Sequence, residues 1–310
     1  MKHPVRVAIT IRSFDLQGSA FKSLQDHFTI SFVNTSGKRM SESELIAALS
    51  ECEAVIAGTE IFSKGVIDKC SALRIISRVG VGTDSIDLNA AKVRGIHVAT
   101  TPNSPVQAVA EHTLALLLAA MKNIPQYNEQ MRKHNTGLMK GSLLSGKTVG
   151  IVGLGRVGSR VAEMLDALGC HISYFDPMVS SELPTSWKRF ESLAGLVQNS
   201  DIISIHSAPL PDGKPLISNN ELSLAKGITL VNTARGTLID EQSLIEALTS
   251  GRVKSAALDV FPVEPYTGNL LGFPQVVVTP HVASNTEESR GWMEKEAVDN
   301  LIQYFREVNV

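Results

Sequence analysis

The stretch from Lys147 to Asp176 constrains the fold of this chain more than any other. It reads as an apolar strand, a glycine turn, an amphipathic helix and a second strand that ends at an acidic residue. The turn carries the pattern G-x-G-x-x-G, with its glycines at Gly153, Gly155 and Gly158. This pattern indicates a dinucleotide site when a strand precedes it and a helix follows it, and both conditions are met here. The stretch therefore predicts a dinucleotide-binding βαβ unit.

Each glycine of the turn, and the acidic residue after it, has a physical task in holding a dinucleotide. The first glycine allows a tight turn, the second lets the backbone approach a pyrophosphate, and the third lets the helix pack closely on the strand. The phosphates then lie at a helix N-terminus, where N–H groups and the helix dipole stabilise anions. Asp176 can accept both hydroxyls of an adenosine ribose and would repel a 2′-phosphate, so we expect NAD rather than NADP. The alternative is a turn that binds nothing.

Length, charge and cysteine content limit the remaining classes of function. A chain of 310 residues with 43% hydrophobic and 19% charged residues is typical of a globular protein of about two domains. The net charge of −2 and the scattered Lys and Arg residues predict no nucleic-acid partner and no membrane surface. Cys52, Cys70 and Cys170 lack metal-ligand spacing, so we expect reduced thiols, no metal and a cytoplasmic location. No signal peptide is expected, and the apolar segment Ala108–Met121 is too short to span a membrane.

Strands and helices alternate along the first hundred residues, which predicts a parallel sheet covered on both faces. The expected strands are Val5–Thr10, Thr29–Val33, Ala54–Ala57, Arg74–Val79 and His97–Thr100. The expected helices are Gly18–His27, Glu42–Ser50, Lys64–Lys69 and Leu88–Arg94. Ser41 and Glu44 have the spacing of a capping box at the start of the second helix.

The segment Thr101–Pro105 interrupts this alternation with two prolines, so we expect a domain boundary there. A long helix, Val106–Lys122, and a polar loop, Asn135–Gly146, come next. Six further strands then fit the doubly wound order of a dinucleotide-binding domain: Thr148–Val152, His171–Phe175, Ile202–His206, Thr229–Asn232, Ser255–Leu258 and Val276–Thr279. The chain closes with a helix, Glu287–Glu307, whose apolar stripe is Met293, Ala297, Leu301 and Phe305.

Three polar residues follow strands of the second sheet, at the edge where open parallel sheets bind ligands. Arg235 can hold a carboxylate through its rigid guanidinium fork. His281 can take a proton from an alcohol at neutral pH, and Glu264, in a loop stiffened by prolines, can orient its imidazole. Taken singly, each also fits a simpler role as a solvated surface arginine, a loop histidine or a surface acid.

At this point the sequence resembles the D-isomer-specific 2-hydroxyacid dehydrogenases over nearly its whole length. Six separated segments carry the resemblance: Val79–Asp84, Val109–Thr113, Gly150–Gly158, Asn232–Gly236, Ala257–Phe261 with Glu264-Pro265, and Thr279–His281. The resemblance implies an α/β fold with two doubly wound parallel-sheet domains. A flavodoxin-like substrate domain would comprise residues 1–101 plus 283–310, and a Rossmann NAD-binding domain would comprise residues 102–282.

The same resemblance assigns roles to individual residues. The catalytic set would be Arg235, Glu264 and His281. Besides the glycine turn and Asp176, cofactor contacts would come from Arg156 and Val157 at the pyrophosphate, Ser207 and Pro209 at the adenosine, and Thr233, Asp259 and Val81 at the nicotinamide. Substrate contacts would come from Arg78, Val79, Gly80, Val81 and Gly82, with Arg235 and His281. His112 and His206 are expected to be structural.

The implied reaction moves a hydride between C2 of a small D-2-hydroxy acid and the nicotinamide. The candidate pairs are 3-phosphoglycerate, hydroxypyruvate with glycerate, and glyoxylate with glycolate. Arg78 favours phosphoglycerate, because phosphoglycerate-oxidising members of the family also carry an arginine beside this glycine loop. However, the turn Ala57–Glu60 lacks the arginine that those enzymes often use as a second phosphate contact. Arg12 or Lys64 could take its place. The chain resembles phosphoglycerate dehydrogenase-like members that lack a regulatory domain.

Two alternatives from other classes remain open at this stage. Some relatives sense NADH without significant turnover. The second alternative is a formate- or phosphite-type dehydrogenase. Formate-oxidising relatives usually pair the histidine with a glutamine, so Glu264 speaks against formate, whereas phosphite-oxidising relatives keep the glutamate and agree with Glu264. No regulatory domain is expected after Val310, and the family's mode of assembly implies a homodimer formed through the long helices of the cofactor domain.

Overall fold

The computed structural model describes residues 4–135, 137–178 and 183–308. The chain forms two compact units, each built on one parallel sheet. The first unit contains the described parts of Met1–Pro105 and Thr286–Val310, and the second contains those of Val106–Asn285. The expected α/β fold with two doubly wound parallel sheets is therefore confirmed, whereas the assignment of substrate to one domain and cofactor to the other stays a prediction.

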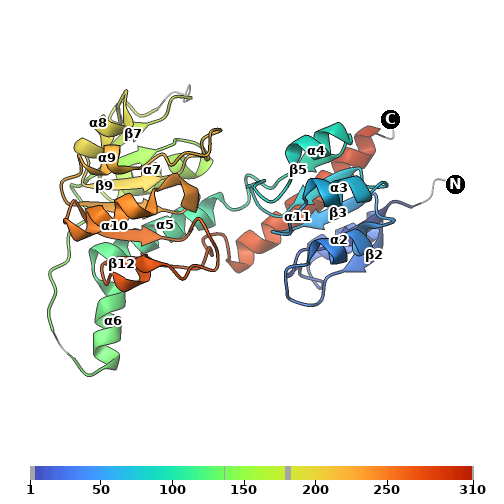
Figure 1. Ribbon diagram of the computed structural model, residues 1–310, viewed down its shortest axis with the longest axis horizontal. Helices are drawn as coiled ribbons and strands as arrows, with labels where there is room; N and C mark the ends of the chain where they lie inside the picture. Colours follow the sequence, from blue (N-terminus) through green and yellow to red (C-terminus); the bar gives the residue numbers. More distant parts are fainter. Residues whose placement is uncertain (1–3, 136, 179–182, 309–310) are drawn as a thin grey trace. The chain divides into compact units, whose positions relative to one another are not determined.

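The first unit has five parallel strands in the order β2-β1-β3-β4-β5, the flavodoxin-like order. Its strands are β1 (Arg6–Ile9), β2 (Thr29–Val33), β3 (Ala54–Ala57), β4 (Ile75–Arg78) and β5 (His97–Ala99). Its helices are α1 (Ser19–His27), α2 (Glu42–Leu49), α3 (Lys64–Lys69), α4 (Leu88–Val93) and α11 (Glu287–Val308). Figure 1 shows α11, drawn in red, beside the blue strands of this sheet.

The terminal helix α11 belongs to the first unit because its apolar stripe completes that unit's core. Met293, Ala297, Leu301 and Phe305 are each at most 5% exposed, and they pack with apolar residues of β1, β3 and β4. The capping box that opens α2 is also present, since Ser41 N–H donates to Glu44 Oε2 at 2.7 Å and Glu44 N–H donates to Ser41 Oγ at 3.4 Å.

The second unit has seven parallel strands in the order β12-β11-β10-β9-β6-β7-β8, which is the Rossmann order with one extra strand at an edge. Its strands are β6 (Thr148–Val152), β7 (His171–Phe175), β8 (Lys188–Arg189), β9 (Ile202–Ile205), β10 (Ile228–Asn232), β11 (Val253–Leu258) and β12 (Val276–Val278). Its helices are α5 (Val106–Met121), α6 (Ile124–Arg132), α7 (Arg156–Ala167), α8 (Leu193–Gln198), α9 (Asn219–Leu222) and α10 (Glu241–Thr249), with 3-10 turns η1 (Gly236–Leu238) and η2 (Asn269–Gly272).

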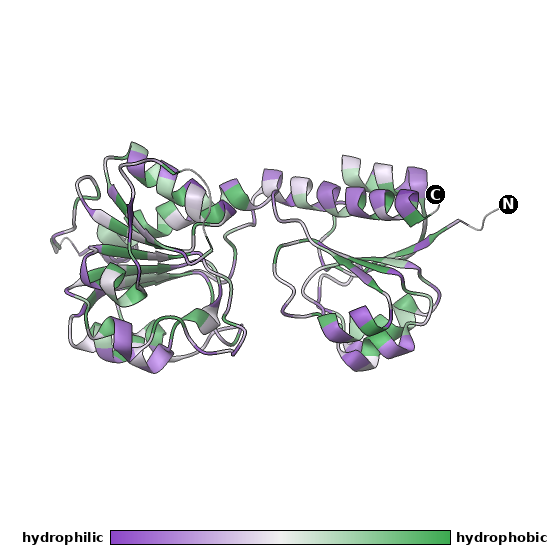
Figure 2. Cartoon of the chain, turned by 90° about the horizontal axis from the view of Figure 1, so that it is seen from above, coloured by the Kyte–Doolittle hydropathy of each residue, from purple (hydrophilic) through white to green (hydrophobic). Residues whose placement is uncertain are grey.

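The apolar helix α5 is buried inside the second unit. Ala110, Leu116 and Leu117 are at most 4% exposed and share a core with residues of α7 and the sheet. In Figure 2 the strands of each sheet are mostly coloured as hydrophobic, while hydrophilic residues lie on the outer turns of the flanking helices. Within the described ranges, no helix is long and apolar enough to cross a membrane.

Two elements of the second unit were not expected from the sequence. Helix α6 begins at Ile124 and buries none of its residues, so no apolar stripe marks it. Strand β8 has only two residues, both exposed, and it adds a seventh strand to the six that were expected. All three cysteines are buried free thiols, and the described residues contain no group of three or more His, Cys, Asp or Glu side chains that could hold a metal.

Candidate active site

The glycine turn after β6 has the geometry of a dinucleotide site. Gly153 adopts a φ of +90°, which favours glycine, and a Cβ there would lie 2.9 Å from the backbone N of Ser207. A Cβ at Gly158 would lie 2.0 Å from Gly153 O, so only glycine lets α7 pack this closely. A Cβ at Gly155 would meet no atom within 4 Å, which leaves open space at the first turn of the helix.

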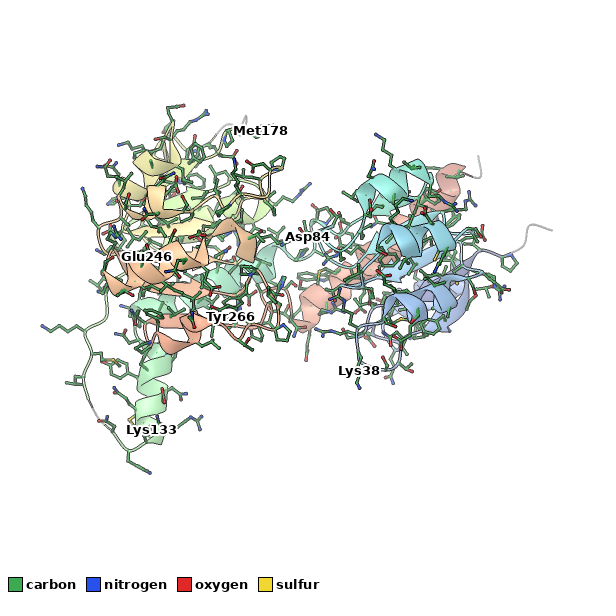
Figure 3. All side chains as sticks on the ribbon, viewed as in Figure 1. Lys38, Asp84, Lys133, Met178, Glu246 and Tyr266 are labelled. Carbon is green, nitrogen blue, oxygen red and sulfur yellow. The ribbon has the colours of Figure 1, made fainter. Side chains whose placement is uncertain are left out.

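The N-terminus of α7 and the acid Asp176 complete this side of the site. Gly155 caps α7 without any side-chain hydrogen bond, so the first N–H groups remain for a phosphate. Each oxygen of Asp176 accepts one backbone N–H at 2.7 Å, Oδ2 from Leu154 and Oδ1 from Met178, which is labelled in Figure 3. A carboxylate oxygen can accept a second hydrogen bond, so the side chain is oriented and still able to receive ribose hydroxyls.

The other expected cofactor contacts of the second unit also follow its strands. Arg156 and Val157 are the first residues of α7, and Ser207 and Pro209 follow β9. Thr233 follows β10, and its Oγ1 lies 2.8 Å from Thr113 Oγ1 on α5.

His206 directly follows β9, and its Nε2 lies 2.8 Å from Ser204 Oγ. Burial lowers the pKa of His206 to about 4, so the imidazole is neutral at physiological pH. Its expected structural role suits this neutral, hydrogen-bonded state.

Arg235 lies immediately before η1, on a segment that packs directly against the loop carrying Glu264. Asn232 Nδ2 donates to Arg235 O at 2.8 Å, which holds the turn after β10. A Cβ on Gly236 would lie only 1.9 Å from the carbonyl carbon of Phe261, so glycine is required for the two segments to meet. The Arg235 turn and the Glu264 loop are therefore in backbone contact.

Glu264 and His281 form a hydrogen-bonded pair. Glu264 Oε2 lies 2.8 Å from His281 Nδ1, and Glu264 Oε1 accepts the N–H of Phe261 at 3.1 Å. Because an ionised carboxylate only accepts, Nδ1 carries the hydrogen and Nε2 presents its lone pair. The side chains of His281 and Glu264 are 48% and 37% exposed, so the pair is open to a ligand.

The backbone of His281 is held in a strained conformation by Asp259. His281 has a φ of +55°, which is uncommon for a residue with a side chain, and its N–H donates to Asp259 O at 2.8 Å. The Asp259 carboxylate is fully buried and accepts the N–H groups of Val282 and Ala283, both at 2.9 Å. Asp259 thus holds the backbone of His281 and of the two residues that follow it.

A polar chain links Asp259 to helix α5. Thr279 Oγ1 donates to Asp259 Oδ1 at 2.6 Å, and His112 Nε2 lies 3.0 Å from Thr279 Oγ1 and 3.5 Å from Asp259 Oδ1. Since the single hydroxyl hydrogen of Thr279 goes to the carboxylate, His112 Nε2 must be the donor in its own contact. Burial opposes ionisation of Asp259, but hydrogen bonds from His112, Thr279 and the two backbone groups outweigh it and lower its pKa.

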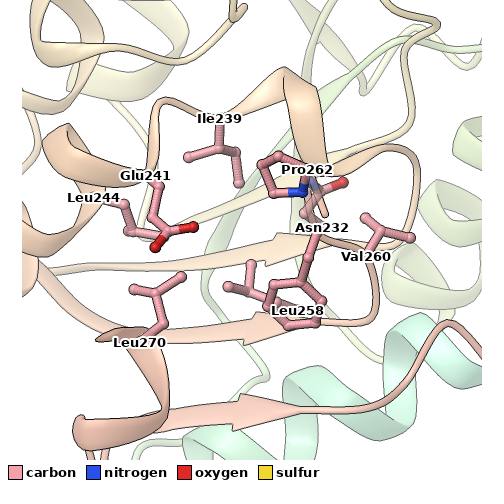
Figure 4. A pocket seen from close by; sticks show the side chains of 10 residues that line it. Asn232, Ile239, Glu241, Leu244, Leu258, Val260, Pro262 and Leu270 are labelled. Carbon is pink, nitrogen blue, oxygen red and sulfur yellow. The ribbon is translucent and has the colours of Figure 1, made fainter. Parts of the chain in front are cut away.

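Aromatic packing stabilises the loop that carries Glu264. Phe261 and Tyr266 stack with ring centroids 4.1 Å apart, and Tyr266 Oη donates to Glu241 Oε1 at 2.7 Å. Burial raises the pKa of Tyr266 to about 12. The cavity under this loop measures only about 10 Å³, room for one water molecule, and Figure 4 shows its lining by Leu244, Leu258 and neighbouring side chains. It is too small to be the substrate site.

In the first unit, the expected substrate residues lie just after β4. Arg78 ends the strand, and its guanidinium covers Gly80, where a Cβ would lie 2.0 Å from Nη1. Gly80 has a φ of +135°, and its N–H already donates to Thr101 Oγ1 at 2.7 Å.

The neighbouring residues of this loop differ in exposure. Val79 is 5% exposed and packs in the core, whereas Val81 is 49% exposed. Among the described residues, the N–H groups of Val81 and Gly82 have no hydrogen-bond partner, so they are the loop's available donors.

Two further polar residues lie in surroundings that the sequence does not indicate. His112, expected only to be structural, joins the network behind His281 through Thr279. Glu60, in the turn that lacks the second arginine, is 1% exposed. For His112, the family segment Thr279–His281 is the sequence feature that could have indicated its contact. For Glu60, no local sequence pattern indicates its burial. Arg12 is exposed, and Lys64 forms an ion pair with Asp68, so a phosphate contact from either residue stays a prediction.

Comparison with known proteins agrees with this geometry. The family model described as D-isomer specific 2-hydroxyacid dehydrogenase, NAD binding domain, matches residues 114–283. The D-3-phosphoglycerate dehydrogenase of Mycobacterium tuberculosis is 39% identical over 254 residues, which cover 80% of this chain and 48% of that protein. The chain thus spans about half the length of the curated relatives it matches.

Solved structures match over nearly the whole chain. An acyclic imino acid reductase in complex with NADPH and D-Arg has a TM-score of 0.88 at 29% identity, with 98% of both chains covered. An NADPH-dependent glyoxylate/hydroxypyruvate reductase from Sinorhizobium meliloti has a TM-score of 0.86 at 28% identity, with 97% of this chain and 95% of that chain covered. The chain therefore belongs to the D-isomer specific 2-hydroxyacid dehydrogenase family, and its second unit contains the family's NAD binding domain.

Proposed function

We propose that this protein is an NAD-dependent dehydrogenase that interconverts a small D-2-hydroxy acid and the matching 2-keto acid. The observation that carries the proposal is the exposed Glu264–His281 pair, anchored at 2.8 Å and placed after β11 and β12 of a dinucleotide-binding sheet. A histidine whose Nδ1 is held by a carboxylate presents Nε2 as a base or, once protonated, as an acid.

The proposed proton path uses the hydrogen bond between Glu264 and His281. In the oxidising direction, His281 Nε2 takes the hydroxyl proton of the substrate, and Glu264 stabilises the imidazolium that forms. In the reducing direction, the same nitrogen returns the proton to the keto oxygen. Arg235 holds the substrate carboxylate through its guanidinium fork.

The residues around the glycine turn fit a bound dinucleotide. When bound, the nicotinamide exchanges a hydride with C2 of the substrate. Gly155 and the first N–H groups of α7 receive the pyrophosphate, and Asp176 receives the ribose hydroxyls. Two structural relatives are named with NADPH, but a carboxylate at Asp176 repels a 2′-phosphate, which supports NAD for this chain. The kcat/KM for NADH should exceed that for NADPH, and the reverse ranking would refute this choice.

The activity can be tested with purified protein, NADH and a panel of glyoxylate, hydroxypyruvate, phosphohydroxypyruvate and pyruvate. His281→Ala should lower turnover about 10²–10⁴-fold on the best substrate, because it removes the acid–base group. His171→Ala is the matched control, since His171 begins β7 on the surface. Wild-type turnover in His281→Ala would overturn the role of His281. NADH binding without turnover on any keto acid would favour an NADH-sensing protein.

The proposal extends to a homodimer. Helix α6 buries none of its residues, and an apolar set on α6 and the segment after it is more than half exposed: Ile124, Met131, Leu138 and Leu143. Figure 3 shows Lys133, which directly follows α6, at the end of the helix remote from the sheet of its unit. A second copy of the chain would bury this apolar surface. Light scattering should give twice the chain mass, and Leu138→Glu should shift it towards the monomer; a wild-type monomer would refute the dimer.

A further inference from the structure

Glu60 is a buried acid at the edge of the first unit's sheet where its substrate residues lie. It follows β3, whose last residue, Ala57, is the register partner of Arg78 on the neighbouring parallel strand β4. Two backbone hydrogen bonds join the loops after these strands: Val79 N–H to Ala57 O and Phe62 N–H to Ser85 O, both at 2.8 Å. The loop that carries Glu60 therefore lies directly beside the loop that carries Arg78 and Gly80.

The side chain of Glu60 is held in place rather than solvated. It is 1% exposed, and its Oε2 accepts the N–H of Gly58 at 2.6 Å. Burying a carboxylate in this way is costly unless charges or hydrogen bonds compensate it. Burial raises the pKa of Glu60, while backbone N–H groups and the positive charges of Arg39 and Arg78 oppose that rise. Glu60 thus places an acidic group close enough to Arg39 and Arg78 for their charges to act on it.

We infer that Glu60 is a specificity-determining residue that makes the first unit favour 2-keto acids with an uncharged far end over those with a phosphate there. A phosphate carries nearly two negative charges, and it needs uncompensated guanidinium groups to hold it. Here the negative charge of Glu60 neutralises part of the field of Arg78 and repels a second anion. The substrate class is therefore an unphosphorylated acid of the hydroxypyruvate or glyoxylate kind.

This inference rests on the proposed function, and its test separates the two. The wild-type chain should show a higher kcat/KM with hydroxypyruvate than with phosphohydroxypyruvate. In Glu60→Gln, which keeps the size of the side chain and removes its charge, the ratio of phosphohydroxypyruvate to hydroxypyruvate kcat/KM should rise about tenfold or more. Glu51→Gln is the matched control, because it makes the same charge change in the same unit beside Arg6, at the opposite edge of the sheet.

Direct binding provides a readout that does not depend on turnover. Calorimetry with 3-phosphoglycerate and glycerate should show that Glu60→Gln gains affinity for the phosphorylated acid alone, and thermal melting should confirm that the variant is folded. A wild-type preference for the phosphorylated acid, or an unchanged ratio in folded Glu60→Gln, would overturn the role of Glu60. Absence of turnover on both keto acids would instead overturn the proposed function, while the binding ratio would still decide the role of Glu60.

Discussion

Gly236→Ala tests whether backbone contact between two loops sets the geometry of the Glu264–His281 pair. The added Cβ would lie 1.9 Å from the carbonyl carbon of Phe261 and 2.3 Å from Pro262 N. Restoring an ordinary separation of 3.4 Å requires a shift of about 1.5 Å, and the atoms that must move belong to the backbone rather than to a flexible side chain. Because Glu264 Oε1 is held by Phe261 N–H, this shift displaces the carboxylate from His281.

A displacement of about 1 Å in a catalytic group can cost 10²-fold, so kcat of Gly236→Ala should fall by about that factor. The Kd for NADH should change little, because the glycine turn after β6 is untouched. The assay compares single-turnover rates with NADH binding measured by fluorescence. Gly272→Ala is the matched control, since a Cβ there would meet no atom within 4 Å. A kcat within twofold of wild type in Gly236→Ala would refute the steric argument.

Three further perturbations test other parts of the structure. Thr279→Val removes the hydroxyl that links His112 to Asp259, so the free energy of unfolding should fall by about 1–3 kcal/mol and kcat should fall about tenfold. Thr279→Ser, which keeps the hydroxyl, should retain both values, and a wild-type kcat in Thr279→Val would contradict the role of this network. The pKa of His206 is about 4 in the folded protein and about 6.5 in the unfolded chain, so the unfolded state binds more protons between these pH values and the free energy of unfolding decreases as the pH is lowered through them, by at most about 3 kcal/mol. Urea titrations of wild type and His206→Gln from pH 7.5 to 4.5 should show a smaller loss of stability in the variant, and equal losses would refute this. Gly291→Ala, on α11 with no atom within 4 Å of the new Cβ, should raise the free energy of unfolding by about 0.5–1 kcal/mol in the same titration, and a loss would show strain at that turn.

The strands of both sheets could be predicted because buried parallel strands are short apolar runs bounded by polar turns. Four of them, β2, β3, β6 and β7, have the bounds that the sequence predicts. Helix α6 could not be predicted in the same way, because a helix that buries nothing has no periodic signal. The two-residue β8 is specified by its partner β7 rather than by its own residues.

Part of the candidate site could also be predicted from the sequence, because parallel strands place their C-terminal ends together. Glu264 and His281 follow neighbouring strands, and parallel strands bring their C-terminal ends to one edge, so their proximity was expected. The contact between His112 and Thr279 joins residues 167 positions apart, and no local pattern specifies it. The burial of Glu60 likewise depends on how two loops meet, which only the folded chain determines.

The orientation of Asp176 has a consequence for attempts to change the cofactor of this protein. Its two oxygens are already bound by the N–H groups of Leu154 and Met178. Replacing Asp176 with a small neutral residue would remove a negative charge and would also release two main-chain donors, the N–H groups of Leu154 and Met178, at the proposed ribose position. Under the proposed preference for NAD, a change to NADPH would then begin from these two released N–H groups, and a cationic side chain would be an addition rather than the first requirement.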